Sequence, residues 1–399
     1  MDVVAPDAAQ GPCTGLRVVD FSTVISGPLC TQILGDLGAE VVKVESPGGD
    51  FSRHTPPVRE GMSGFFASFN RNKRSIQLDL KNDAGRDVAR RLCRDADVVV
   101  ENFRPGVADR LGIGWKDLSP ENEKLVYVSI SGFGPEGPYA AHPAYDLVIQ
   151  GLVGIMPVQG GEQGPPVLMK SLVADKCTAM TAANAVLGAL LHRERGNGRG
   201  QKIDVPMLDS FAAYVLPDLI VGHVLDPQPA PPPAVDIYRT FPTRDGYVTG
   251  IIIQDSQFEG FCRAIGREDL LEKAEYKTII DRLLNAEELF GVCEEALRGL
   301  GTDDFIERAR EFGAPFAPAQ TIEEFLDDPQ VKHSRVHFQT EDPHGGRTRM
   351  LRHPVRYADS PASLRRHPPR IGEHTDEILA DAGFDAAAVA RLRGEGVVG

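Results

Sequence analysis

The 399-residue chain is short of positive charge. It carries 43 Lys and Arg against 57 Asp and Glu, which gives a net charge of −14 at neutral pH, and the acidic residues are spread along the sequence. Nucleic acids and anionic membranes attract a basic face, so this balance argues against sequence-independent binding to either. Any anionic ligand must therefore be held by a local cluster of cations.

Long apolar runs and metal-ligand patterns are also missing. No uninterrupted apolar stretch reaches the roughly 18 residues that a membrane span needs. Residues 1–15 lack the charged start and apolar run of a signal peptide. The six cysteines have no metal-ligand spacing, which predicts reduced thiols rather than a disulfide framework. We therefore expect a soluble, cytoplasmic protein without a metal centre.

Several catalytic motifs are absent as well. No G-x-G-x-x-G follows the first predicted strand, and the sequence has no P-loop, no H-E-x-x-H and no G-x-S-x-G. The ten histidines are scattered, and none stands at ligand spacing from a cysteine or carboxylate. These absences argue against a dehydrogenase, an NTPase, a zinc hydrolase and an α/β-hydrolase.

What the sequence does contain is an alternation of strand-like and helix-like segments in its first half. Buried strands are predicted at residues 16–22, 40–45, 75–80, 97–103 and 125–131, and helices at 29–37 and 82–94. Such β-α-β units predict an α/β fold with a largely parallel sheet and helices on both faces. Ligands of these sheets bind at the carboxyl ends of the strands, here residues 22–28, 102–106 and 131–137.

The second half has a different pattern. An alanine-rich helix is predicted from about residue 176 to 194 and is apolar enough to be buried. The proline run at 226–234 (DPQPAPPPA) predicts an extended linker. Beyond it, Asp245-Gly246 between two strand-like runs predicts a hairpin, and three helices complete a small α+β domain ending near residue 330. Terminal helices are predicted at 374–382 and 386–393.

Two local features can contact an anionic ligand. Residues 70–75 (NRNKRS) place three cations just before a strand, where Lys and Arg can hold phosphates. A solvated basic turn explains the same residues. Asn102 stands at the end of a buried strand. It can contact a ligand there, but asparagine is also common in turns, which explains its presence equally well.

Asp175 is the most informative carboxylate. It lies in residues 172–178 (LVADKCT), where an apolar segment runs into the buried helix. Asp is a favoured N-cap and its charge suits the helix dipole. A carboxylate fixed at a helix start in apolar surroundings is also poorly hydrated, as a carboxylate nucleophile requires. Cys177 is the rival nucleophile, although a core cysteine is the better interpretation because no histidine lies near it in sequence.

Seven segments together carry a resemblance to a known family. They are LRVVDFSTVISGP, LGDLGAEVVKVESPGGD, FNRNKRSIQLDLK, DVVVENFRPG, SGFGPEGPY, GRGQKIDVPMLD and GEHTDEIL. In their order and spacing, over nearly its whole length, the chain resembles the class III coenzyme A transferase family. That family includes formyl-CoA transferase, carnitine CoA-transferase and the α-methylacyl-CoA racemases.

The resemblance implies a fold and an assembly. It implies a large Rossmann-like domain formed by both chain ends, residues 1–225 and 335–399, and a small α+β domain at 235–330. The proline-rich linker at 226–234 falls between them. It also implies that two chains interlock as a homodimer.

The resemblance further implies acyl-CoA:carboxylate CoA-transferase activity, with Asp175 as the nucleophile. A mixed anhydride forms on Asp175 and is followed by an aspartyl-CoA thioester. The substrates are an acyl-CoA and a free carboxylic acid. Coenzyme A enters as a substrate, and no permanently bound cofactor is implied. The implied CoA contacts are Val24, Ile25, Ser26, Asn72, Lys73, Arg74, Asn102, Phe103, Arg104, Arg110, Ala144 and Tyr145.

Two alternatives remain open at this point: an α-methylacyl-CoA racemase or epimerase acting by 1,1-proton transfer, and a non-catalytic CoA-binding paralogue. Tyr145 stands where the racemases have histidine, and Asp255 is shorter than their supporting glutamate. Retention of Asp175 argues against the paralogue. Formyl-CoA transferases carry a run of glycines in the region of residues 251–257 (IIIQDSQ), which has none here, so specificity for formate or oxalate is not expected.

Overall fold

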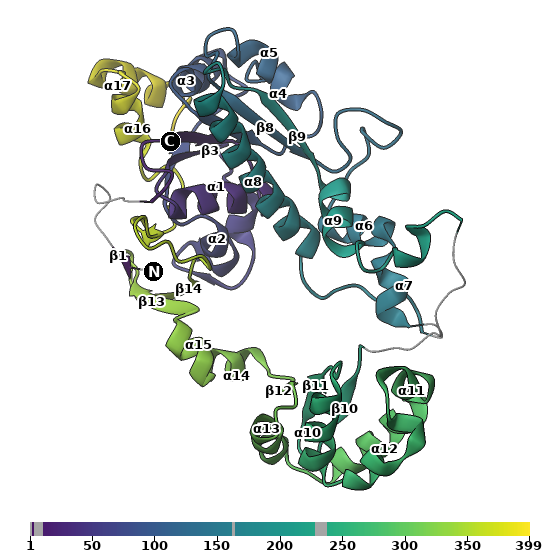
Figure 1. Cartoon of the computed structure of the whole chain (residues 1–399). Helices are drawn as coiled ribbons and strands as arrows, with labels where there is room; N and C mark the ends of the chain where they lie inside the picture. The colour runs from purple at the N-terminus through teal and green to yellow at the C-terminus, as the bar shows by residue number, and fades with distance from the viewer. Residues whose placement is uncertain (1, 4–10, 162–163, 228–237) are drawn as a thin grey trace. The chain divides into compact units, whose positions relative to one another are not determined.

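The computed structural model of the chain describes residues 2–3, 11–161, 164–227 and 238–399 (Figure 1). The chain divides into two compact units. Unit 1 consists of Met1–Val221 and Arg335–Gly399, and unit 2 is Gly222–Ser334. Residues 228–234 of the predicted linker lie outside the described residues.

A six-stranded parallel sheet forms the centre of unit 1. Its order is β6-β3-β2-β7-β8-β9, with bounds Lys73–Gln77, Glu40–Glu45, Arg17–Asp20, Val98–Glu101, Val126–Ser131 and Lys202–Pro206. Numbered along the chain this is 3-2-1-4-5-6, the order of doubly wound sheets, which reverses between β2 and β7. The predicted parallel α/β sheet is confirmed. Strand β9 was not predicted because its sequence, KIDVP, is not an apolar run.

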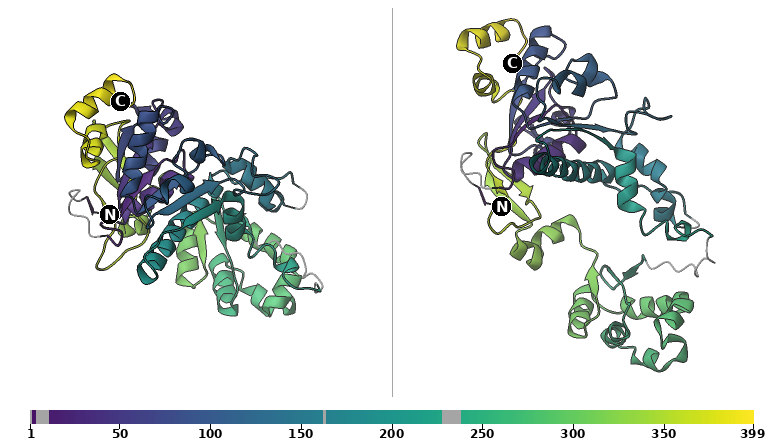
Figure 2. Two further views of the ribbon diagram at one scale, coloured as in Figure 1. Left: turned by 90° about the horizontal axis from the view of Figure 1, so that it is seen from above. Right: turned by 45° about the horizontal axis from the view of Figure 1, so that its top comes forward.

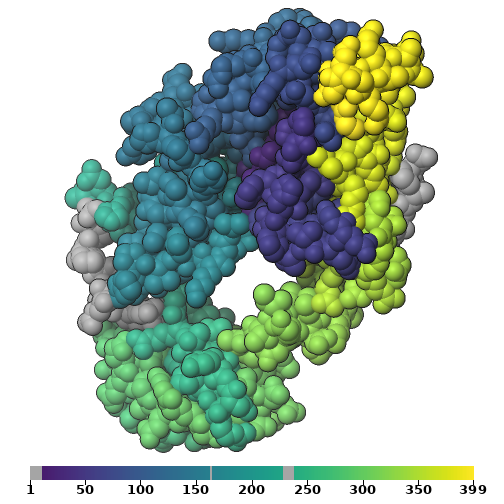
Figure 3. Space-filling view, turned by 180° about the vertical axis from the view of Figure 1, so that it is seen from behind, coloured from purple at the N-terminus to yellow at the C-terminus, as the bar shows by residue number. Residues whose placement is uncertain are grey.

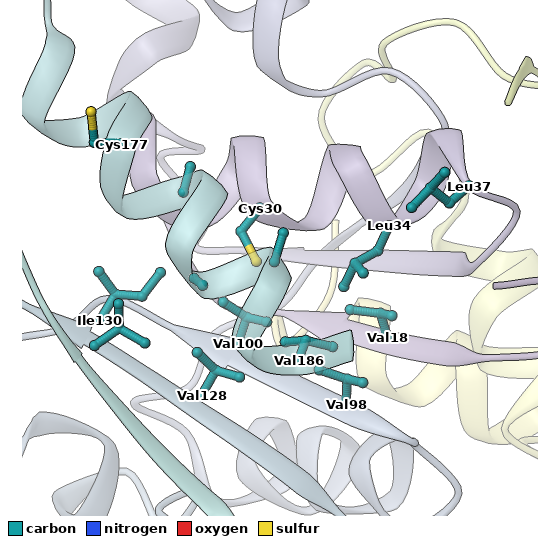
Figure 4. Packing of buried hydrophobic residues seen from close by; sticks show 14 of the residues in the cluster. Val18, Cys30, Leu34, Leu37, Val98, Val100, Val128, Ile130, Cys177 and Val186 are labelled. Carbon is teal, nitrogen blue, oxygen red and sulfur yellow. The ribbon is translucent and has the colours of Figure 1, made fainter. Parts of the chain in front are cut away.

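Both faces of the sheet are buried, which explains the valine-rich strands. In β7, Val98 and Val100 belong to one core and Val99 to the other, and none of the three is exposed to solvent. The first core lies under α1 (Ser26–Asp36) and α8 (Val173–Arg195), whose side chains cover the strand valines in Figure 4. The alanine-rich composition of α8 suits this position, because small side chains let it approach α1 closely.

The second face is covered by helices from both ends of unit 1. They are α3 (Asp83–Arg94), α5 (Trp115–Leu118), α16 (Thr375–Asp381) and α17 (Ala386–Gly394). In the space-filling view of Figure 3 the yellow C-terminal residues lie directly against the purple and blue N-terminal ones. The sequence predicted the two terminal helices but not this packing surface.

Helices α6 (Asp146–Val153) and α9 (Met207–Val215) pack on each other and on α8 (Figures 1 and 2). The remaining helices of unit 1 are α2 (Gly64–Phe69), α4 (Val107–Arg110) and α7 (Ile155–Gly160). The remaining strands pair as β1 with β15 (Asp2–Val3, Ser363–Leu364), β4 with β5 (Val58–Arg59, Met62–Ser63) and β13 with β14 (His337–Glu341, Arg347–Leu351).

Unit 2 is a small α+β arrangement. Strands β10 (Thr240–Pro242), β11 (Tyr247–Gly250) and β12 (Phe316–Pro318) form an antiparallel sheet, and the first two make the hairpin predicted around Asp245-Gly246. Its helices are α10 (Asp255–Ile265), α11 (Ile279–Leu284), α12 (Ala286–Arg298), α13 (Thr302–Glu311), α14 (Ile322–Asp327) and α15 (Pro329–Ser334).

All six cysteines are free and buried, as the sequence predicted. Among the described residues, no helix is both long and apolar enough to span a membrane.

Candidate functional site

A cavity of about 210 Å³ opens at the carboxyl ends of β2, β7 and β8. Doubly wound sheets bind ligands at this edge, where the strand order reverses. All three strand ends identified from the sequence contribute to its lining. Its wall includes Thr23, Val24 and Ser26 after β2, Asn102, Phe103 and Arg104 after β7, and Ser131 and Gly132 at the end of β8.

Asn102 joins the first two strand ends. Its carboxamide oxygen accepts the backbone N–H of Thr23 at 2.9 Å, and its Nδ2 donates to the Thr23 carbonyl at 2.8 Å. Nδ2 also lies 3.4 Å from the hydroxyl of Ser26. An amide side chain that bonds both the backbone N–H and the carbonyl of one residue holds the two loops in a fixed register, so Asn102 shapes the wall of the cavity as well as facing it.

The wall also contains a strained backbone. Val24 has a φ of +69°, a region that a β-branched residue rarely adopts. Both carboxylate oxygens of Asp50 lie 3.2 Å from the Val24 nitrogen and accept its N–H. Lys43 pairs with Asp50 at 3.0 Å and donates to the Ser22 carbonyl at 2.8 Å. Strain of this kind persists where surrounding contacts over-determine it, as at binding sites.

Beneath this loop lies a buried ionic network. Lys73 pairs with Asp20 at 2.9 Å, and neither side chain is exposed. Although burial by itself would raise the pKa of Asp20, the charges of Lys73 and Lys43 lower it to about 2. Burial lowers the pKa of Lys73 to about 8, against the pull of Asp20. The network therefore supports the loop between β2 and α1 from inside the fold.

Asp175 lies in the cavity wall, in the first turn of α8. The expected N-cap role is wrong: the helix begins at Val173 with Leu172 as N-cap, so Asp175 is its third residue. Hydrogen-bonding interactions with the hydroxyl and the backbone N–H of Ser26, the first residue of α1, lower the pKa of its carboxyl group. The carboxylate thus meets the positive amino ends of two helices, which favour its negative charge.

Burial nevertheless raises the pKa of Asp175 to about 6, with a further contribution from the nearby charge of Asp146. The hydrogen bonds from Ser26 act in the opposite direction. At pH 7 such a carboxylate is ionised by about ten to one, yet it is more basic than an ordinary aspartate. It therefore has the ionisation state and the basicity of an activated nucleophile.

Asp146 and Gln150 were missed by the sequence analysis. Asp146, the first residue of α6, is buried and accepts the backbone N–H of Asp175 at 3.0 Å. Its other oxygen accepts a 2.6 Å hydrogen bond from Gln150, which is also buried. The available signal was a carboxylate and an amide four residues apart, a spacing that would place both on one face of a helix, but no helix was predicted here.

The structure brings together eight of the thirteen residues expected at the site. Those lining the cavity are Val24, Ser26, Asn102, Phe103, Arg104, Ala144, Tyr145 and Asp175. Ile25 does not belong to this lining, because it is only 1% exposed and packs inward as the N-cap of α1.

The side chains of the basic turn at residues 70–75 have partners within the fold. Asn72 has a φ of +61° and holds the returning C-terminal segment, accepting the backbone N–H groups of Arg365 and Arg366. The Lys73 ammonium donates to Asp20, Asn70 and the Pro28 carbonyl inside the fold. Arg74 forms ion pairs with Glu377 and Asp381 of α16. The sequence could not distinguish these internal partners from a ligand.

Arg110 remains accessible. It is exposed at the end of α4, next to Leu111, which lines a second cavity of about 460 Å³. This second cavity shares Thr23 and Phe103 with the first and continues along residues 44–50 and 78–81. The two cavities therefore form adjoining spaces along one edge of the sheet.

Cys177, the rival nucleophile, is 7% exposed and packs into the first core from the buried face of α8. Burial raises the pKa of its thiol, as does the charge of Asp146, which disfavours a thiolate. Within the described part of the chain, no group of three or more His, Cys, Asp or Glu side chains could hold a metal ion.

Comparison with known proteins identifies the family of the chain. Residues 14–375 match the family described as CoA-transferase family III. The chain is 35% identical to succinyl-CoA:mesaconate CoA-transferase from Haloarcula marismortui, covering 94% of this chain and 98% of that protein. It is 31% identical to human succinyl-CoA:glutarate CoA-transferase, covering 97% and 90%.

A solved structure matches as well. A CAIB/BAIF family protein from Brucella suis superimposes with a TM-score of 0.84 at 33% identity, covering 94% of this chain and all of that one. The resemblance carried by the seven sequence segments is thereby confirmed. The chain belongs to CoA-transferase family III and is an enzyme of the CoA-transferase class.

Proposed function

We propose that this protein is an acyl-CoA:carboxylate CoA-transferase that works through covalent intermediates on Asp175. The observation that carries the proposal is the setting of this carboxylate. It lies in the wall of a cavity at the strand-order reversal, it is held by Ser26, and its pKa is raised by burial to about 6. This environment supports a nucleophilic role, because a well-hydrated aspartate attacks a thioester poorly.

The reaction balances without any other group. An oxygen of Asp175 attacks the thioester carbonyl, the carbon–sulfur bond breaks, and a mixed anhydride and a CoA thiolate result. The thiolate then attacks the aspartyl carbonyl and expels the donor acid as its carboxylate, which leaves an aspartyl-CoA thioester. The acceptor carboxylate attacks this thioester to give a second anhydride and thiolate. Attack of the thiolate on the acceptor acyl carbon releases the new acyl-CoA and restores the Asp175 carboxylate.

The two adjoining cavities support one arrangement of the substrate. We assign the thioester end to the cavity that contains Asp175 and the nucleotide end to the larger cavity, with Thr23 and Phe103 between them. Arg110 is an exposed cation next to the larger cavity and is the residue that we propose for the CoA phosphates. Arginine suits this role because its planar fork matches phosphate oxygens.

We propose aliphatic dicarboxylic acids as the acids exchanged. The relatives act on succinate, mesaconate and glutarate by their names, and the cavity wall contains the guanidinium group of Arg104. A second carboxylate on the acyl group would find positive charge there. Racemase chemistry is not proposed, because a tyrosine such as Tyr145 is a poor base near neutral pH compared with the histidine that racemases carry there, and Asp255 is engaged by Arg282 at 2.6 Å.

An exchange assay tests this function. The enzyme is incubated with succinyl-CoA and ¹³C-labelled glutarate or mesaconate. In a parallel reaction it is incubated with a 2-methylacyl-CoA in deuterated water, and the CoA esters of both reactions are measured by mass spectrometry. We expect the labelled acid in the CoA ester pool and no deuterium at the α-carbon of a 2-methylacyl-CoA. Asp175→Asn should abolish the exchange. Deuterium incorporation without exchange of acids would refute the proposal.

We also propose that the chain forms an interlocked homodimer. The support is a set of exposed apolar side chains on α6, α7 and α9: Leu147, Val148, Leu152, Val158 and Tyr214. Contiguous apolar surface of this kind is typical of subunit interfaces. Because interlocked chains bury far more area than an ordinary interface, light scattering should give a dimer at every concentration down to the micromolar range. A monomer would contradict the assembly.

A further inference from the structure

The first turn of α8 is capped by a side chain from another helix. The first N–H groups of a helix have no partner within the helix and need acceptors from elsewhere. Leu172, the N-cap residue of α8, has no side-chain oxygen and makes no capping hydrogen bond. The acceptor for the N–H of Asp175 is instead the carboxylate of Asp146, which belongs to α6 and lies 29 positions earlier in the chain.

Asp146 is itself held in place. Gln150, one turn later on α6, donates to it at 2.6 Å and also donates to the Ser171 carbonyl at 3.0 Å. The Gln150 side-chain oxygen accepts the backbone N–H of Met169 at 3.0 Å. The segment that leads into α8 and the first turn of α8 are therefore fixed by one pair of side chains on α6. Asp146 is 2% exposed and Gln150 is fully buried, so water does not compete for these bonds.

The electrostatic surroundings of Asp175 give Asp146 a second effect. The charged or titratable groups near Asp175 are Lys176 and Cys177 on α8, Arg104 and His142 in the cavity wall, Tyr145 before α6, and Asp146. Lys176 donates to the Ser171 hydroxyl at 2.6 Å. Asp146 is the acidic member of this group, and a like charge disfavours ionisation of its neighbour.

We propose that Asp146 is a positioning residue for the transfer reaction: its buried carboxylate caps α8 from α6 and thereby orients the Asp175 carboxylate toward Ser26 and the cavity. This inference rests on the proposed function of Asp175. Asp146 does not touch the substrate in this role. It fixes the turn that carries the nucleophile and keeps that nucleophile more basic than an ordinary aspartate.

The variant Asp146→Asn tests the proposal, with Asp87→Asn on the exposed face of α3 as a control that removes the same charge far from the site. In Asp146→Asn the like charge is gone, so the acidic limb of the pH profile of kcat/KM should move to lower pH. The misplaced turn should lower kcat by about 10- to 100-fold on the plateau. Asp87→Asn should leave both unchanged.

Gln150→Met is a second variant, which loosens Asp146 without removing its charge. It should lower kcat on the plateau without moving the acidic limb to lower pH. If Asp146→Asn does not fold, Gln150→Met still separates orientation from charge, and an unchanged kcat in this variant would overturn the positioning role.

A readout independent of activity completes the test. The Asp175 carboxyl carbon is titrated by ¹³C NMR in ¹³C-aspartate-labelled enzyme and assigned by its loss in Asp175→Asn. The titration midpoint should fall in Asp146→Asn. An unmoved midpoint and an unmoved acidic limb would overturn the inference even if acids are exchanged. Absence of exchange in the wild-type enzyme would instead refute the proposed function, while the NMR titration still reports on Asp146.

Discussion

The carboxylate of Asp175, in the first turn of one helix, interacts with the hydroxyl and the backbone N–H of Ser26, the first residue of another, and both groups lower its pKa. The amino ends of α8 and α1 thus meet at one ionisable group. Both helix ends favour its negative charge, while burial opposes it. The balance leaves Asp175 ionised at neutral pH and still basic enough to attack a thioester.

This relationship predicts the effect of Ser26→Ala. Loss of the hydroxyl removes one hydrogen bond to the charged form, so the pKa of Asp175 should rise further above 6. The acidic limb of kcat/KM should move to higher pH, and the rate at pH 6 should fall by about tenfold, a typical effect of one charge-assisted hydrogen bond. Ser26→Thr, which keeps the hydroxyl, is the matched control. An identical pH profile in Ser26→Ala would contradict the arrangement.

Arg110→Gln tests the proposed phosphate contact. Because Arg110 is exposed next to the larger cavity, its neutralisation should weaken CoA binding by about tenfold or more, and the weakening should diminish at high salt. Calorimetric titration with CoA measures this directly. Arg94→Gln at the end of α3, which removes the same charge from an exposed position, should bind as the wild type does. Equal affinity in both variants would show that Arg110 does not contact the CoA phosphates.

Lys73→Met should act on folding rather than on binding. Removal of one member of a buried ion pair leaves Asp20 uncompensated, which costs about 3–5 kcal/mol in the free energy of unfolding. Denaturation with urea should show this loss, while CoA affinity of the folded variant should stay within about twofold of the wild type. Weakened CoA binding with unchanged stability would show that Lys73 meets the phosphates after all.

The buried carboxyl group of Glu101 should make the stability of the fold depend on pH. Burial raises its pKa to about 7, whereas an unfolded glutamate has a pKa of about 4.3. The folded chain therefore holds this proton more tightly, so its stability contribution is full below pH 4.3 and falls as pH rises to about 7. Glu101→Gln keeps the acceptor for the Phe103 N–H, a 2.8 Å hydrogen bond. The variant should raise the Tm clearly at pH 8 and much less at pH 5, where only a small part of the contribution has been lost.

A Tm difference that is equal at pH 5 and pH 8 would contradict the raised pKa of Glu101. The corresponding exposed control is Glu121→Gln, whose carboxylate is 48% exposed. It should change the Tm little at either pH, because surface ion pairs contribute about 0–1 kcal/mol.

The sheet could be predicted because its strands are short apolar runs in regular alternation with helices. Val98, Val99 and Val100 must point alternately to opposite faces, and all three are apolar, so both faces had to be buried. Strand β9 could not be predicted in this way, since Lys202 and Asp204 interrupt its apolar pattern and pair with each other at 2.8 Å.

The candidate site could be predicted in part. The strand-end rule identified the segments that contain Val24, Asn102 and Ser131, all of which line the cavity. The roles of Lys73 and Asn72 could not be predicted, because a cation or amide before a strand looks the same in sequence whether its partner is a ligand or the fold. Their partners are 53 and about 290 positions away in the chain.

The central claim is that the acyl group is carried by Asp175. The most direct measurement is a peptide map of the enzyme after incubation with an acyl-CoA and no acceptor acid, with hydroxylamine used to trap activated carboxyl groups. We predict a hydroxamate on the peptide that contains Asp175, absent from Asp175→Asn and from enzyme incubated with free CoA. A trapped adduct on Cys177, or none on Asp175 while acids are still exchanged, would contradict the account.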